Sequence, residues 1–167
     1  MGILYSIESV GQYIQDAGEN WLSRIGFTVP REITFGRMPT TRDLRIALDA
    51  LDGYQIRYVV DDCSWTADVI ESSESALPDR TTLRLSNYSG DEGQPQSVVL
   101  EKGSELLVIR IGELMSHTCG PLVVDNDMNG APLLITSGTD LQIALQEWRE
   151  ISQRIQELTS QGYSASS

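Results

Sequence analysis

The chain has 167 residues, which is typical of one domain and long enough to bury a hydrophobic core. It carries 12 Lys and Arg against 24 Asp and Glu, for a formal net charge of −12. This charge argues against direct binding of nucleic acid, which needs a basic surface, and the 40% hydrophobic content argues against a disordered chain. No apolar run is long enough to predict a membrane span, no signal peptide is evident, and we expect a cytoplasmic protein.

The N-terminal part predicts two helices with a strand between them. Apolar side chains recur at steps of three and four over residues 3–21, the spacing of a helix with one buried face. Residues 31–35 alternate and predict a short strand. The second helix is expected to begin with a threonine N-cap at Thr40 or Thr41 and to end at Gly53.

The middle of the chain predicts a run of short strands separated by polar turns. They are expected over residues 54–60, 63–70, 81–86 and 97–100. Residues 104–120 are ambiguous: the β-branched side chains at 108, 109 and 111 favour a strand, or a strand followed by a helix. The N-cap residue Ser104 and the apolar spacing favour one helix, which is the preferred prediction by a narrow margin.

The last third predicts a hairpin followed by a long helix. Two apolar segments, residues 122–124 and 133–135, flank Asn129-Gly130, a dipeptide typical of tight hairpin turns. Thr139 and Gln142 fit a capping box at the start of the helix, and apolar residues then follow helical spacing as far as residue 158.

Together these segments predict a single α+β domain over residues 1–160 and a flexible tail over residues 161–167. Strands joined by turns favour a largely antiparallel sheet of about five to seven short strands. The N-terminal helix, the C-terminal helix and one or two internal helices would pack on it. The strand order does not follow from the sequence.

Acidic residues are densest between residues 61 and 79, where none of the residues is basic. An aromatic side chain among acids suits a basic protein surface, because the ring supplies desolvated contact and the charges steer association. We predict a partner-binding surface there. It consists of Asp61, Asp62, Trp65, Asp68, Glu71 and Glu74. The alternative interpretation is an acidic surface that serves solubility alone.

Asp125, Asp127 and Asn129 precede Gly130 in the pattern D-x-D-x-N-G, the first half of a calcium-binding loop. The twelfth loop position is Thr136, where a bidentate Glu is expected, and the flanking segments predict strands rather than helices. An acidic hairpin turn is therefore favoured over a Ca²⁺ site, and no cofactor is expected.

The residues of nucleophilic catalysis do not form a pattern. His117 is the only histidine, and on a helix it would point about 200° away from Cys119. Cys63 and Cys119 lack zinc-site spacing and are expected to be reduced thiols. Gly2 fits the N-myristoylation pattern, which is short and often matched by chance.

The sequence favours a small acidic, non-enzymatic interaction module that binds and neutralises a partner with a basic surface, such as a toxin or nuclease. Immunity proteins and antagonists act in this way. One alternative is a metal-dependent hydrolase using Asp61, Asp62, Asp125 and Asp127. Another is an assembly protein that forms a homodimer, or a larger oligomer, through its terminal helices. The sequence identifies neither the partner nor the oligomeric state.

Overall fold

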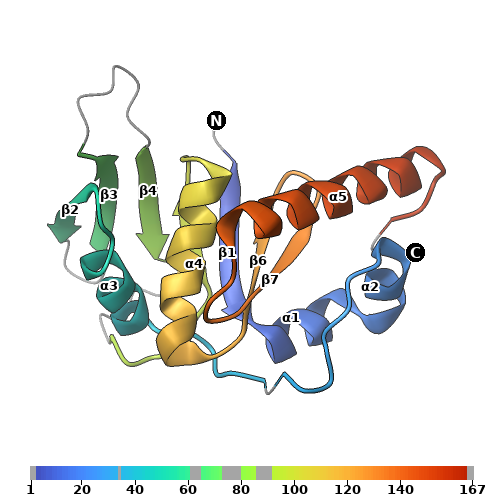
Figure 1. Ribbon diagram of the computed structural model, residues 1–167, viewed down its shortest axis with the longest axis horizontal. Coiled ribbons are helices and arrows are strands. Elements are labelled where there is room, and N and C mark those ends of the chain that lie inside the picture. Colours follow the sequence, from blue (N-terminus) through green and yellow to red (C-terminus); the bar gives the residue numbers. More distant parts are fainter. Residues whose placement is uncertain (1–2, 34, 61–64, 73–79, 86–91, 165–167) are drawn as a thin grey trace.

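The computed structural model describes residues 3–33, 35–60, 65–72, 80–85 and 92–164, and these contain seven strands and five helices (Figure 1). The strands are β1 (Leu4–Ser9), β2 (Tyr54–Val60), β3 (Trp65–Glu71), β4 (Arg80–Leu85), β5 (Val98–Glu101), β6 (Leu122–Asn126) and β7 (Pro132–Ile135). The helices are α1 (Val10–Ala17), α2 (Glu19–Ile25), α3 (Thr41–Asp49), α4 (Glu105–Cys119) and α5 (Leu141–Ser160).

The strands form one sheet in the order β2-β3-β4-β5-β1-β6-β7, and every neighbouring pair is antiparallel. Helices α3, α4 and α5 lie on one face of this sheet (Figure 1). The predicted α+β fold with a largely antiparallel sheet is therefore confirmed. Within the described residues, no helix is both long and apolar enough to cross a membrane.

The core lies between the sheet and the helices. In β1, the buried side chains of Tyr5 and Ile7 point to the same face of the sheet, toward the helices. The centre of the Tyr5 ring lies 5.6 Å from that of Trp148 in α5. Helix α4 contacts α3, α5 and the sheet, which explains why it is apolar around most of its circumference. A Cβ at Gly112 would come within 2.8 Å of the Ile135 side chain, so this glycine lets α4 lie close to β7.

The prediction of one helix over residues 3–21 is wrong. Residues 4–9 form β1, which pairs with β5 on one side and β6 on the other. Tyr5, Ile7 and Ser9 are its buried positions, and Gly18 separates α1 from α2 with a φ of 85°. The three-and-four spacing fits a helix locally, but pairing with two strands far away in the sequence decides the structure.

The predicted strand over residues 31–35 is also wrong, since its described residues belong to no strand. They lie in the segment that connects α2 to α3. Pro30 accepts a turn hydrogen bond from the Ile33 amide, and further along the amide of Arg37 donates to the Cys119 carbonyl at 3.0 Å. Alternation over so few residues cannot specify a strand without a neighbour to pair with.

Later predictions agree better with the structure. The helix favoured over residues 104–120 is α4, capped by Ser104, and the hairpin flanking Asn129-Gly130 is β6–β7. The capping box of the last helix is wrong: Asp140, not Thr139, is the N-cap of α5 and accepts hydrogen bonds from two amides. Thr139 instead bonds the backbone of Thr136.

Candidate functional site

The predicted partner-binding residues fall in and around β3. Asp61, Asp62 and Glu74 lie outside the described residues, whereas Trp65, Asp68 and Glu71 lie on the strand. Successive side chains of a strand point to opposite faces, so Trp65 and Glu71 share the helix-covered face and Asp68 lies on the other. The described members of the predicted set are thus divided between the two faces of the sheet.

Trp65 is not an exposed anchor, because only 7% of it is accessible. Its ring meets Tyr58 edge-on at 5.5 Å, and the guanidinium of Arg45 lies over both rings, 5.4 Å from Trp65 and 5.8 Å from Tyr58. The indole N–H is buried and has no hydrogen-bond acceptor among the described residues. Trp65 therefore helps to hold α3 against the end of the sheet.

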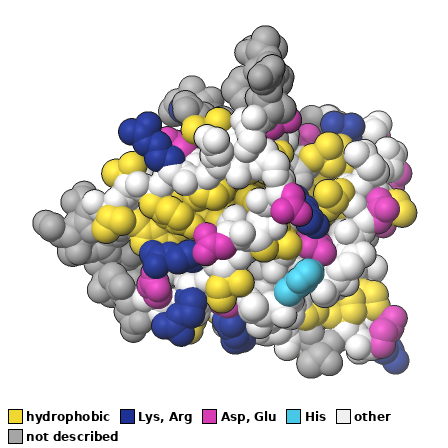
Figure 2. Space-filling view, turned by 60° about the vertical axis from the view of Figure 1, so that its left-hand side comes forward, with side chains coloured by type: hydrophobic (Ala, Val, Ile, Leu, Met, Phe, Trp, Pro, Cys, Tyr) yellow, Lys and Arg dark blue, Asp and Glu magenta, His cyan; other side chains and the backbone are white. Residues whose placement is uncertain are grey.

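The strand next to Trp65 carries exposed apolar side chains. β2 lies at the end of the sheet, and no described strand pairs with its outer side, which we call the β2 edge. Val59 and Val60 are 53% and 76% exposed. Figure 2 brings this side of the molecule forward and shows a band of hydrophobic side chains bordered by charged ones.

The two ends of the sheet differ sharply. β7, at the other end, has only four residues, begins with Pro132 and packs against α5. Short length, proline and a covering helix are common ways of protecting an edge strand from unwanted pairing. β2 has seven residues, contains neither proline nor glycine, and carries Arg57 as its only charge. β2 is thus longer than β7 and free of proline, and no strand of the described residues pairs with its outer side.

Two exposed acidic side chains lie close to β2. Asp49 and Asp52 are both exposed, and the Tyr58 hydroxyl donates to Asp49 Oδ1 at 3.3 Å. Beside them Ile46 projects from α3 and is half-exposed, while Arg45 forms an ion pair with Glu92. The β2 edge therefore combines an apolar strand with exposed acids beside it.

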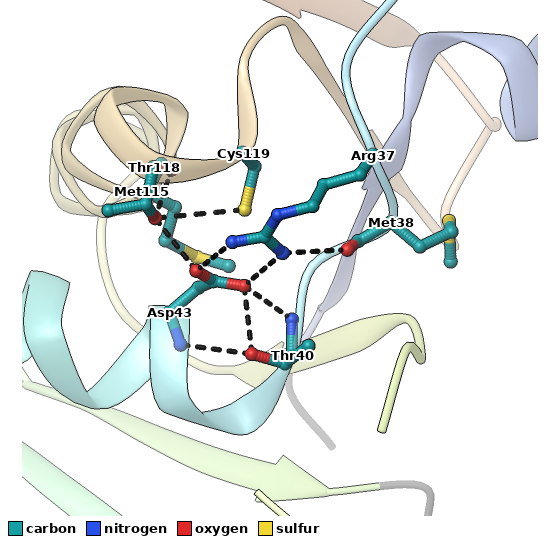
Figure 3. Close-up of polar contacts among 7 residues, drawn as sticks. All are labelled: Arg37, Met38, Thr40, Asp43, Met115, Thr118 and Cys119. Atoms are coloured by element: carbon teal, nitrogen blue, oxygen red, sulfur yellow. Dashed lines mark hydrogen bonds and ion pairs between the residues drawn. The ribbon is translucent and has the colours of Figure 1, made fainter. Parts of the chain in front are cut away.

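Helix α3 carries Arg45, Ile46 and Asp49, and its position is fixed at its N-terminus (Figure 3). Thr40 and Asp43 form a capping box there. Arg37 donates to both oxygens of Asp43, and the Thr118 hydroxyl donates to Asp43 Oδ1 at 2.8 Å. The Asp43 carboxylate thus joins α3 to the end of α4 and to the preceding connection.

The electrostatics of this junction follow from its contacts. Burial would raise the pKa of Asp43, but hydrogen bonds from Arg37, Thr118 and Thr40 outweigh burial and hold the pKa well below its usual value. Burial, followed by the nearby Asp43 charge, raises the pKa of the Cys119 thiol to about 12. Cys119 is therefore protonated and a poor nucleophile at neutral pH.

His117 contacts a different group from Cys119. Its Nε2 lies 3.1 Å from Oε1 of Glu113, one turn earlier on α4. Glu113 is buried and also lies 3.6 Å from Arg110. His117 thus contacts Glu113 rather than Cys119, as its helical position relative to Cys119 predicts.

The structure gives the predicted calcium ligands other partners. Asp127 Oδ1 accepts from the Leu4 amide and Asn129 Oδ1 accepts from the Ala131 amide, both at 3.0 Å. Asp125 lies within β6, so its carboxylate belongs to the sheet rather than to the turn. The described residues hold no group of three His, Cys, Asp or Glu placed to bind a metal.

Sequence reasoning missed a carboxyl pair between neighbouring strands. Asp125 is opposite Ser6 in the β1–β6 register, which places Glu8 diagonally from it on the same face. Burial raises the pKa of Asp125 to about 6, and burial and then the Asp125 charge raise that of Glu8 to about 7. One Asp125 oxygen is buried without a hydrogen-bond partner among the described residues. The only sequence signal is an acid at an alternate position of each strand.

Comparisons with protein families, with curated proteins and with solved structures find no match for this chain.

Proposed function

We propose that this chain is a protein-interaction module that binds a partner protein with a basic surface at the β2 edge. The observation that carries the proposal is the contrast between the two ends of the sheet: β7 is short and covered, whereas β2 is long, apolar and exposed. An exposed apolar edge favours pairing with another chain. We therefore infer that β2 is exposed because a partner binds there.

The charges support the basic character of the partner. The chain has a net charge of −12, so it attracts cationic proteins over distances of about one Debye length, roughly 8 Å at physiological salt. Asp49 and Asp52 place exposed acids beside the apolar strand, where they would steer a basic surface onto it. The proposed contact lies on β2 rather than at Trp65, because Trp65 is only 7% exposed. A neutraliser of a toxin or nuclease is the specific form of the proposal.

The experiment begins with capture of partners from a lysate of the source organism at low salt. The captured protein is then purified, and its association rate with the chain is measured. Reversal of Asp49 and Asp52 to Lys should slow association by about tenfold, and added salt should reduce this difference. The matched control reverses Glu147 and Glu150, two exposed acids of α5, and should have a much smaller effect.

Two results would contradict the proposal. One is a captured partner whose surface is acidic or whose association rate does not depend on salt. The other is equal slowing by the α3 and α5 reversals, which would show that the net charge acts without a localised site. Circular dichroism of all variants establishes that they are folded before the rates are compared.

A further inference from the structure

We propose that the partner supplies an extended segment that pairs with β2 through main-chain hydrogen bonds and so extends the seven-stranded sheet by one strand. This inference rests on the proposed function and adds the binding mode and the chemistry of the segment. It concerns described residues only: the strand Tyr54–Val60 and the adjoining part of α3.

The backbone of β2 is already ordered for such pairing. All seven of its residues are in register with β3, from Tyr54 opposite Glu71 to Val60 opposite Trp65. The inner side of the strand is held by these pairs, and no described strand pairs with the outward amides and carbonyls of Ile56, Tyr58 and Val60. A partner strand therefore meets a rigid template and does not have to order β2 on binding.

The side chains beside the β2 edge define which residues fit. Ile56, Tyr58 and Val60 share one face of the sheet with Trp65, over which Arg45 of α3 lies. Alternate residues of an added strand point to this face, so they should be apolar. The segment should also carry Lys or Arg, since the exposed Asp52 lies two residues before Tyr54 and the exposed Asp49 accepts a hydrogen bond from Tyr58.

A second copy of this chain fits the edge poorly. Two antiparallel copies of β2 related by a two-fold axis would place the Tyr54 end of one beside the Val60 end of the other. In the sequence, Asp49 and Asp52 precede Tyr54, and Asp61 and Asp62 directly follow Val60. Such a pair would bring together two chains that each carry −12, so like charges would oppose it. A basic segment would instead be attracted to the acidic chain.

The probe is a synthetic peptide of about nine residues, the length of a long strand, with alternating Val and Thr and with Lys at both ends. Its binding to the full chain is followed by backbone amide NMR. We expect shifts and slowed hydrogen exchange confined to Tyr54–Val60 and none in β7. A peptide of the same sequence with N-methylated backbone keeps the charge and side chains but cannot pair, and it should not bind.

Matched variants locate the contact. Val60→Lys should weaken binding of the peptide by about tenfold or more, because it opposes the lysines of the probe and removes apolar contact. Ile143→Lys, at a 60% exposed position on α5, should leave binding unchanged. Val59→Lys provides a second variant of the β2 edge if Val60→Lys does not fold.

Equal binding of the methylated and unmethylated peptides would overturn strand pairing while leaving a basic partner in place. Absence of any shift in β2 at millimolar peptide would likewise overturn the binding mode, and the capture experiment would then decide the proposed function separately. A dimer in sedimentation that Val60→Lys dissociates would assign the edge to a second copy instead.

Discussion

Arg37 donates hydrogen bonds to both carboxylate oxygens of Asp43, at 2.6 and 2.7 Å, from the segment that precedes α3. Asp43 is the third residue of that helix and caps its N-terminus together with Thr40. The pair therefore determines where α3 begins. Since the same helix places Arg45 over the rings of Tyr58 and Trp65, the junction also shapes the β2 edge.

Replacement of Asp43 with Asn should lower the free energy of unfolding by about 2 kcal/mol, because the amide cannot accept the paired hydrogen bonds of Arg37. Urea denaturation at neutral pH measures this loss. Arg37→Ala should cost less, about 1 kcal/mol, because Arg37 is half-exposed and the threonine bonds to Asp43 remain. A larger loss for Arg37→Ala than for Asp43→Asn would contradict the central place of the carboxylate.

The Glu8–Asp125 pair predicts lower stability as pH rises. Both pKa values are raised in the folded chain, so the folded state binds more protons than the unfolded state between pH 5 and pH 8. The stabilisation is complete below the pKa of the unfolded carboxyls and is lost as pH passes through about 6 and then about 7. Unfolding by urea across this range should show the decline.

The double variant Glu8→Gln with Asp125→Asn should flatten that decline, because neither amide ionises. If the variant keeps the full pH dependence of the parent, other groups cause it. Asp43 acts in the opposite direction: its lowered pKa stabilises the fold above pH 4 and ceases to do so at more acidic pH.

Gly36→Ala should destabilise the fold. A Cβ at Gly36 would overlap the backbone carbonyl oxygen of Cys119. Because the clash is with backbone, no side chain can rotate to relieve it. We expect a loss of about 1–3 kcal/mol in thermal or urea unfolding. Gly11→Ala is the matched control: its Cβ meets no atom within 4 Å in α1, and it should stabilise by about 0.5–1 kcal/mol. Similar effects of both substitutions would refute the close approach at Gly36.

Cys119 should resist alkylation in the folded chain. Its thiol is buried and its pKa is raised to about 12, so little thiolate forms at pH 8. A Cys63→Ser variant isolates this thiol, and iodoacetamide labelling followed by mass spectrometry gives the rate. Labelling should be slow in buffer and rapid in urea. Rapid labelling of the folded chain would show that the junction around Asp43 opens frequently.

Much of the fold follows from local sequence features. Thr40 and Ser104 cap α3 and α4, and Asn129-Gly130 lies between β6 and β7, because capping and turn chemistry depend on adjacent residues. The N-terminal strand does not follow, since its pairing with β5 and β6 involves residues about a hundred positions away. Helical spacing over residues 3–21 gives no sign of that pairing.

The candidate site was only partly predictable. The acid-rich segment directs attention to the β2–β3 region, but the sequence does not say that Trp65 faces α3 or that β2 ends the sheet. Edge position depends on strand order, which no local pattern encodes. The Glu8–Asp125 pair likewise requires the β1–β6 register. The sequence therefore indicates which region of the chain forms the site, but it does not indicate that β2 is the exposed strand.

Amide hydrogen exchange of the chain, free and saturated with its purified basic partner, tests whether the partner binds at the β2 edge. Exchange should slow in the outward-facing amides of β2, while the exposed face of α5 is unchanged. Slowing confined to α5 or to the α1–α2 region, with β2 exchanging as in the free chain, would contradict binding at this edge.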